Sequence, residues 1–322
     1  MASPNLSEIV TTTLRNRSGK LSDNFTTNLA LLYRLKEKGN TKTAPGGRTI
    51  VKELEYQENG TFGYYSGYDQ LNISPSDVFT AAEFDWKQAY VAVSWSGLEV
   101  EVQNTGKEAV IDLLGSRIKN AEKTMLNNLS DGVYSDGTGS GGKQIGGLQL
   151  LIADAGTGTV GGINSTTWSF WQNQIYDFSN QGVTASATTI QTAMNTLWLN
   201  LKRNRDVPDL IVADNTYYRY YWESLQAIQR VTNEKMAAAG FENLKFMGAD
   251  VVPDGGRSGS CPANHMYFVN SDYLFYQPHK DRNMVVLDPT RYSTNQDAAV
   301  RLLGWAGNMT CSNRALQGVV LA

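Results

Sequence analysis

This 322-residue chain is short of charge, cysteine and long apolar runs. Its two cysteines, Cys261 and Cys311, are too few for a disulfide framework, so a reducing compartment is the default expectation. No run of about 18 apolar residues is present to span a bilayer, and the N-terminus lacks the apolar core of a signal peptide. From the sequence we therefore expect neither a disulfide-stapled secreted domain nor a membrane-spanning protein.

Charged residues make up 18% of the chain, below the ~25% that is typical of soluble proteins. The net charge is −3, and the densest basic cluster, Lys202–Arg205, is short and is followed by Asp206. Any contact with DNA is therefore expected to be weak and non-specific. A surface poor in charge and rich in Tyr, Trp, Asn and Ser favours extensive burial against other proteins, because desolvating charge is costly.

The most informative stretch, from Val91 to Leu150, has the pattern of a strand, a long amphipathic helix and a glycine-rich loop. Thr105 and Glu108 have the spacing of a capping box, and a helix from Thr105 to Leu129 would be about 37 Å long. Apolar residues recur on one helical face, the predicted core face of this helix: Ile111, Leu114, Ile118, Met125 and Leu129.

Residues 1–47 are polar and contain one short helical patch, which indicates an arm rather than a domain. Residues 48–97 have the pattern of two long strands, the second returning from Phe84 through Trp95, joined by a Gly-, Asn- and Tyr-rich tip. Such a hairpin is marginal alone and must lie against something else. The tip cannot bury its own large side chains, so we predict an intersubunit contact through Phe62, Tyr64, Tyr65, Tyr68, Leu71 and Ile73.

The second half of the chain alternates between strand and helix patterns, which predicts an α/β unit. We expect helices at residues 189–203 and 215–229, and strands at 209–213, 244–252, 266–269, 274–277 and 284–287. The final stretch, 297–321, has the pattern of paired strands.

Two motifs suggest chemistry, and neither is complete. Gly137–Lys143 fits Gly-x-x-x-x-Gly-Lys, but Gln144 stands where a P-loop needs Ser or Thr, and the motif follows a helix instead of a strand. Cys261 and His265 are close, but structural zinc needs four ligands. We therefore predict no catalytic residue, no cofactor and no metal, and interpret the glycine run as a hinge-like turn.

Several segments of the chain, taken in order along the sequence, resemble the major capsid proteins of tailed bacteriophages. These proteins share the fold first described for phage Hong Kong ninety-seven. The run from Tyr65 to Gln88 is similar to the family's extended loop, and SGLEVEVQNTGKEAV…AEKTMLNNL is similar to its long spine helix. Residues 136–152 resemble the loop after that helix. PDLIVADNTYYRYYWESL and LKFMGADVVPD resemble the family's axial domain.

The resemblance implies an α+β capsid fold in four parts. These are an N-terminal arm (1–47), an extended β-hairpin loop (48–97), a peripheral domain with the spine helix (98–155 and 280–312), and an α/β axial domain (156–279 and 313–322). Some family members join subunits through a lysine and an asparagine, helped by a glutamate. Lys87 and Asn308 could serve here, but residues 300–311 hold no glutamate, so we predict no cross-link.

The function that the resemblance implies is a structural one, without enzymatic activity. The chain would assemble as pentamers and hexamers into the icosahedral head of a tailed phage enclosing double-stranded DNA. Scaffold, portal and decoration proteins would be its partners, and assembly would occur in the host bacterial cytoplasm. The alternatives are the shell of a bacterial nanocompartment with the same fold and, in another class, a nucleotide-binding enzyme that uses Gly137–Lys143.

Overall fold

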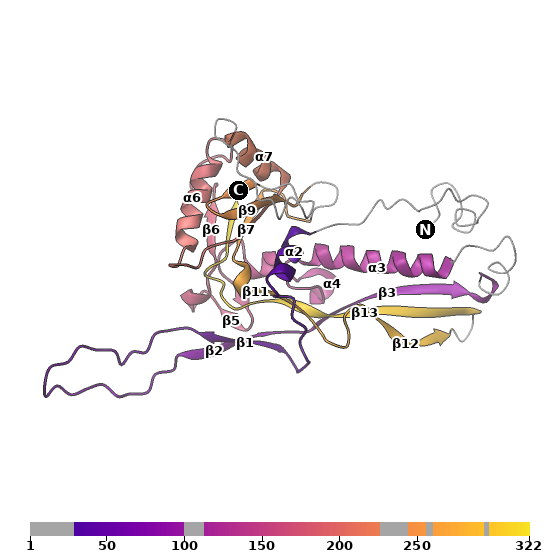
Figure 1. Cartoon of the computed structure of the whole chain (residues 1–322), viewed down its shortest axis with the longest axis horizontal. Helices are drawn as coiled ribbons and strands as arrows, with labels where there is room; N and C mark the ends of the chain where they lie inside the picture. The colour runs from indigo at the N-terminus through magenta and orange to yellow at the C-terminus, as the bar shows by residue number, and fades with distance from the viewer. Residues whose placement is uncertain (1–28, 100–112, 226–243, 256–259, 293–295) are drawn as a thin grey trace.

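A computed structural model describes residues 29–99, 113–225, 244–255, 260–292 and 296–322. The molecule is elongated (Figure 1). A tall α/β part adjoins a long helix that lies along a second sheet, and both the helix and this sheet extend to the right in the view. A hairpin projects in the opposite direction, to the lower left. The mixed α+β class predicted from the sequence is confirmed. No helix within these ranges is long and apolar enough to cross a membrane.

The α/β part is built on a six-stranded mixed sheet with the strand order β6-β14-β10-β7-β9-β8. Its two parallel pairs are β6 with β14 and β7 with β9, and the remaining neighbours are antiparallel. The strands are β6 (Gln174–Asp177), β7 (Leu210–Ala213), β8 (Leu244–Phe246), β9 (Ala249–Pro253), β10 (His265–Val269) and β14 (Gly318–Leu321).

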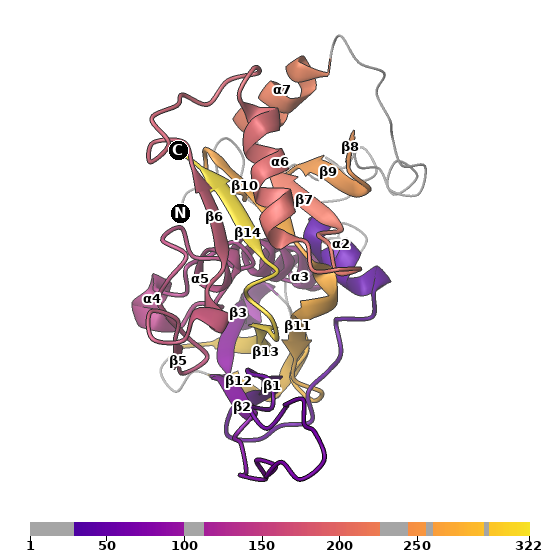
Figure 2. The same ribbon diagram turned by 90° about the vertical axis from the view of Figure 1, so that its left-hand side faces the viewer.

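Both faces of the central strand β7 are buried. Ile211 and Ala213 face a core shared with α6 (Ile190–Leu201) and α7 (Asn215–Ser224), the two helices that cover one face in Figure 2. Leu210 and Val212 belong to the second core, on the other side of the sheet. This explains why the strand is a continuous apolar run instead of an alternating one.

The second sheet is organised by one long strand, β13 (Ala298–Cys311). One edge of β13 pairs with β3 (Lys87–Ser96) over the whole of residues 298–307. The other edge pairs first with β12 (Val285–Tyr292) and then with β11 (Leu274–Pro278). The long helix α3 (Leu113–Gly132) lies beside β3 (Figure 1).

Short elements connect these parts. They are α2 (Ala30–Glu37), α4 (Gly139–Gly142), α5 (Leu148–Leu151), β4 (Thr159–Val160), β5 (Ile163–Asn164) and two 3₁₀ turns, Ser169–Trp171 and Ser271–Tyr273. The return after α3 depends on Gly147, since a Cβ there would lie 2.3 Å from the carbonyl oxygen of Val133. The chain can double back so closely only with glycine at this position.

A fully buried arginine holds the loops of the second core together. The Arg314 guanidinium donates to the carbonyl oxygens of Leu151 (2.7 Å) and Trp171 (3.0 Å) and to Oδ1 of Asn173 (2.9 Å). Burial lowers the pKa of Arg314 to about 10, so the group keeps its charge at neutral pH. The segment between β13 and β14 is thereby tied to residues 151–173.

Three strand predictions need correction. Residues 244–252 are not one strand but the hairpin β8–β9, whose turn residues Met247 and Gly248 both have positive φ. The returning strand of the hairpin is broken at 85–86: β2 (Phe79–Phe84) pairs with β1 (Ile50–Glu55), whereas β3 belongs to the β13 sheet. Residues 297–321 form β13 and β14, which lie in different sheets and do not pair with each other.

Candidate assembly surfaces

The hairpin exposes the side chains that the sequence singled out. β1 and β2 pair from Ile50↔Phe84 to Glu55↔Phe79, and residues 56–78 form the extended tip. The exposed fractions at the tip are Phe62 80%, Tyr64 96%, Tyr65 68%, Tyr68 108%, Leu71 55% and Ile73 90%. This apolar area is not buried within one copy of the chain, which is typical of a contact surface.

Local polar contacts fix the tip without covering its aromatic rings. Ser66 N donates to Oδ2 of Asp69 (2.7 Å), and Asp69 N returns a bond to the Ser66 carbonyl oxygen (3.0 Å). The Asn59 side chain accepts from Thr61 and from Ser76, across the hairpin (3.0 Å). The tip is therefore partly ordered before any partner binds, which lowers the entropy cost of association.

The base of the hairpin packs on the β4–β5 loop. Glu83 N donates to the Gly161 carbonyl oxygen (2.9 Å), and the Tyr56 ring lies 5.6 Å from Trp168 and 5.7 Å from Phe170. A groove of about 720 Å³, which we call the hairpin-base groove, opens here and is lined by the acidic side chains Asp77 and Glu83 among others.

The predicted core face of the long helix is described in part. Met125 and Leu129 are buried in the second core, and Ile118 is half-buried. Leu114 lies in α3, but its side chain is outside the described part, as are Ile111 and the whole capping box at 105–108. α3 continues to Gly132, three residues beyond the predicted end.

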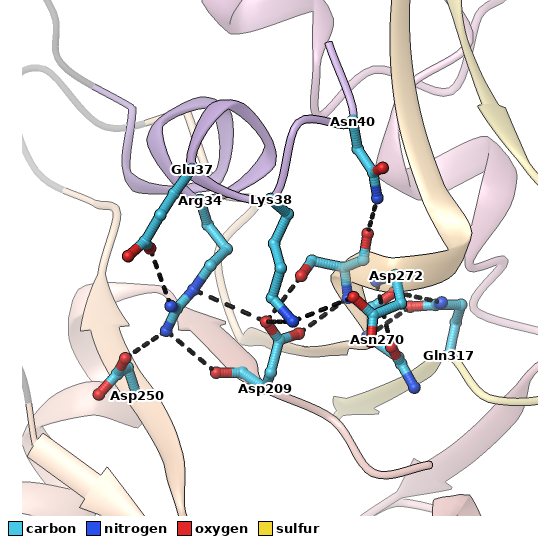
Figure 3. A network of polar contacts seen from close by, with 10 residues as sticks. Arg34, Glu37, Lys38, Asn40, Asp209, Asp250, Asn270, Asp272 and Gln317 are labelled. Atoms are coloured by element: carbon cyan, nitrogen blue, oxygen red, sulfur yellow. Dashed lines mark hydrogen bonds and ion pairs between the residues drawn. The ribbon is translucent and has the colours of Figure 1, made fainter. Parts of the chain in front are cut away.

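Helix α2 connects the N-terminal segment to the six-stranded sheet through a network of charges (Figure 3). The Arg34 guanidinium contacts the buried carboxylate of Asp250 and lies 3.7 Å from Asp209. Lys38 binds Asp272 at 3.0 Å, and Asn40 donates to the Ser271 carbonyl oxygen. Asp209 directly precedes β7, and Asp250 is the second residue of the adjacent strand β9, so the network fastens α2 at the start of two neighbouring strands.

A second polar cluster lies where the end of α3 meets the six-stranded sheet. The Tyr134 hydroxyl donates to the buried Asp254 carboxylate, and Ser260 Oγ contacts Asp131 of α3. Burial raises the pKa of Asp254 to about 6, more than the Tyr134 hydrogen bond lowers it. Nearby, His265 Nε2 lies 3.2 Å from Asp154. Burial lowers the pKa of His265, but the hydrogen bonds to Asp154 and Ala263 and the charges of Asp154 and Asp214 together raise it by more, so the net pKa is raised.

Asp254 makes stability depend on pH in a defined window. The pKa of Asp254 in the folded chain is about 6, above the usual 3.8, so the folded state holds the proton more tightly than the unfolded state. The free energy of unfolding therefore has its full value below pH ~4 and falls by ~3 kcal/mol as the pH rises through 6. Asp254→Asn can still accept from Tyr134 but does not titrate, so we expect the variant to lack this loss. Urea unfolding of both chains at pH 4.5 and 7.5 measures it; equal pH dependence in the two chains would contradict the assignment.

The structure does not give the glycine run the context of a phosphate loop. Residues 139–142 form an irregular turn in which Ser140 and Gly141 have positive φ, and the turn follows α3 and a short bridge instead of a strand. Lys87 Nζ donates to the Gly142 carbonyl oxygen (2.6 Å), so a neighbouring strand holds the turn. These features fit the predicted hinge-like turn better than a nucleotide site.

The other suggested chemical groups are engaged in structural contacts. Cys261 is half-buried, its Sγ facing the His265 carbonyl oxygen at 3.8 Å. Among the residues that the structure describes, no three His, Cys, Asp or Glu side chains are grouped to hold a metal ion. Asn308 is buried, and its amide contacts Asp85 O (2.8 Å), Gly146 N (3.1 Å) and Met309 N (2.9 Å). The Asn308 amide is thus held by contacts within one copy of the chain.

The sequence alone did not indicate the buried charged residues that hold segments of the chain together. Arg34, Asp250 and Arg314 belong to no motif, and the contacts that bury them join distant residues: Arg34 and Asp250 are 216 positions apart, and Arg314 and Asn173 are 141 apart. Only Asp254 has a weak sequence signal of a polar contact, because this acidic residue directly follows an apolar strand.

The chain has the fold of shell-forming capsid proteins. Among the solved structures that it matches is the cyanophage A-1(L) capsid asymmetric unit, with a TM-score of 0.65, 15% identity, and 96% of this chain and 97% of that chain covered. The capsid of a native GTA particle matches at 0.58, with 10% identity over 94% and 95%. The holo-SrpI encapsulin complex from Synechococcus elongatus PCC 7942 matches at 0.55, with 8% identity over 94% and 92%. Neither a protein-family model nor a curated protein matches the sequence.

Proposed function

We propose that this chain is the major capsid protein of a tailed phage, a structural subunit that assembles as pentamers and hexamers into an icosahedral shell around double-stranded DNA. The observation that carries the proposal is the fold likeness over 96% of the chain to a phage capsid subunit, together with a hairpin whose apolar tip one copy leaves exposed. Many repeated interfaces of this kind close a shell without any reaction chemistry.

The proposal assigns a part to each segment. Residues 1–47 are the arm, 48–97 the extended loop, 98–155 with 280–312 the peripheral domain, and 156–279 with 313–322 the axial domain. α3 is the spine helix, with Ile111, Leu114, Ile118, Met125 and Leu129 on its core face. The tip residues Phe62 to Ile73 contact a neighbour. Scaffold and portal proteins are the expected partners, and the virion formed in the host cytoplasm is the expected location.

A nanocompartment shell is the second candidate, and the match to the encapsulin complex supports it. The experiment is to express the chain alone and examine it by electron microscopy and light scattering. Closed shells, or rings of five and six subunits, are expected, and shell diameter and co-purifying cargo distinguish the two candidates. A stable monomer, even with a candidate scaffold, would contradict both.

A further inference from the structure

We propose that this chain binds a small organic anion with an apolar body, a single-chain carboxylate, in a groove between α3, β3 and the glycine turn. We call this the α3 groove. It holds about 550 Å³, within the ~300–1,000 Å³ that is common for small-molecule sites. Its two long walls, α3 and β3, lie side by side in Figure 1. Because one copy forms the whole groove, binding goes beyond the assembly function proposed above and does not depend on it.

The floor of the α3 groove is apolar. Met125 and Leu129 of α3, Ile145 after the glycine turn and Trp305 of β13 line it, and all four belong to the second core. Their exposed fractions are only 1–5%, so the packed core closes the bottom of the groove. Tyr90 of β3, 71% exposed, adds an aromatic wall. An apolar chain bound here leaves water for an apolar surface, which favours binding.

The rim of the α3 groove is positively charged. Lys143 is exposed on the glycine turn, and no carboxylate is among the described residues that line the groove. Within the described part of the chain, the Lys143 ammonium makes no ion pair. Lys87 and Arg282 border the groove, since Lys87 donates to the Gly142 carbonyl oxygen (2.6 Å) and Arg282 to the lining residue Gln88 (3.1 Å). Such a rim favours a negatively charged ligand.

The floor also contains a buried donor without an acceptor. Trp305 is 1% exposed, and its ring stacks on Tyr276 with 5.7 Å between the ring centroids. Its Nε1 has no hydrogen-bond partner among the described residues. An unpaired buried N–H is costly, and a carboxylate oxygen is a strong acceptor for it. A carboxylate in the groove therefore supplies an acceptor that the chain itself does not.

The glycine turn favours a single charge over a polyphosphate. The N–H of Gly142 donates to the Thr138 carbonyl oxygen (2.9 Å), and those of Lys143 and Gln144 donate to the Gly139 carbonyl oxygen. A phosphate cradle needs several free backbone N–H groups that converge on the ligand, and these are already used within the turn. The charged group left for a ligand is one ammonium, which suits one carboxylate.

The hairpin-base groove is a useful comparison within the same chain. It is similar in size but is lined by Asp77 and Glu83, so its charge has the opposite sign. An apolar chain with a negative head group should therefore avoid the hairpin-base groove and occupy the α3 groove.

Calorimetric titration of the full chain with dodecanoate, below the concentration at which it forms micelles, tests the charge requirement. We expect one dodecanoate per chain, and binding at least about tenfold weaker in Lys143→Glu. Lys143→Arg keeps the charge and should bind like the wild type. Dodecyltrimethylammonium, which has the same apolar chain and the opposite charge, should bind the wild type at least about tenfold more weakly than dodecanoate does.

A steric block tests the position of the ligand. Asn128→Trp places a bulky side chain at an exposed α3 position that lines the groove, and it should abolish dodecanoate binding. Leu126→Trp is the matched control: Leu126 is 47% exposed on the same helix but does not line the groove, so this variant should bind normally. Melting temperatures of the two variants show whether each remains folded.

The indole donor has its own test. Trp305→Phe keeps an aromatic ring in the floor but removes the N–H, so we expect dodecanoate binding about threefold weaker or more. Affinity equal to that of the wild type would overturn the part assigned to Trp305.

Three results would overturn the site as a whole. They are no binding of dodecanoate, equal affinity for dodecanoate and dodecyltrimethylammonium, and dodecanoate binding that Lys143→Glu and Asn128→Trp both leave unchanged. None of them bears on shell formation, which electron microscopy measures separately.

Discussion

Replacing Phe62, Tyr64 and Tyr68 together by serine should abolish shell assembly while the melting temperature of the unassembled chain stays unchanged. The three side chains are 80–108% exposed, so folding buries almost none of the area that the substitution removes. In an interface, truncation of one well-buried aromatic costs ~2 kcal/mol or more, and a closed shell repeats that loss at every contact. Electron microscopy and a thermal scan on the same samples measure the two effects.

A matched control separates the tip from general surface hydrophobicity. Leu199 on α6 is 67% exposed, similar to Tyr65, and lies outside the hairpin. Leu199→Ser should therefore assemble. If the triple variant forms normal shells, or if its melting temperature falls by several degrees, the tip is not the surface described here.

Removing Arg34 should have the largest effect on the stability of the chain itself. Asp250 is 2% exposed and Arg34 13%, so Arg34→Ala leaves a buried carboxylate without its guanidinium, at a cost of ~3–5 kcal/mol. Urea unfolding, followed by tryptophan fluorescence, measures the change in the free energy of unfolding.

The double variant Arg34→Met with Asp250→Asn is the informative comparison. It removes both charges, so most of the lost stability should return. Glu37→Ala removes an exposed partner of the same arginine and should cost less than ~0.5 kcal/mol. A single Arg34→Ala variant as stable as the wild type would mean that the network does not fasten α2.

Helices, strands and loops that are determined by residues close together in sequence could be predicted from the sequence. The helical patch predicted within residues 1–47 is α2, and the apolar run predicted as a strand at 209–213 is β7, because burial of one or two faces produces a periodic or continuous apolar pattern in the sequence. The tip was found in the same way, since a Gly-rich loop with large aromatics has nothing local to bury them against.

Features set by distant partners could not be predicted in this way. The β8–β9 turn uses Met247 and Gly248 at positive φ, where Asn-Gly is the usual signal, so the run appeared continuous. The break at Asp85 and Trp86 marks the chain's move from one sheet to another, which depends on the position of β13. The charges of Arg34 and Arg314 gave no sign of burial, because Asp250 and Asn173, the buried side chains that they contact, are far away in sequence.

The position of β13 and β14 has a consequence for the newly made chain. β13 joins β3, β11 and β12, and β14 lies between β6 and β10, yet both follow all of these partners in sequence. During translation, neither sheet can close until residues 298–321 have left the ribosome. The surfaces built on those two sheets are therefore completed only after residues 298–321 have been made and have left the ribosome. The order of strands thus delays subunit association on polysomes until synthesis has passed these two strands.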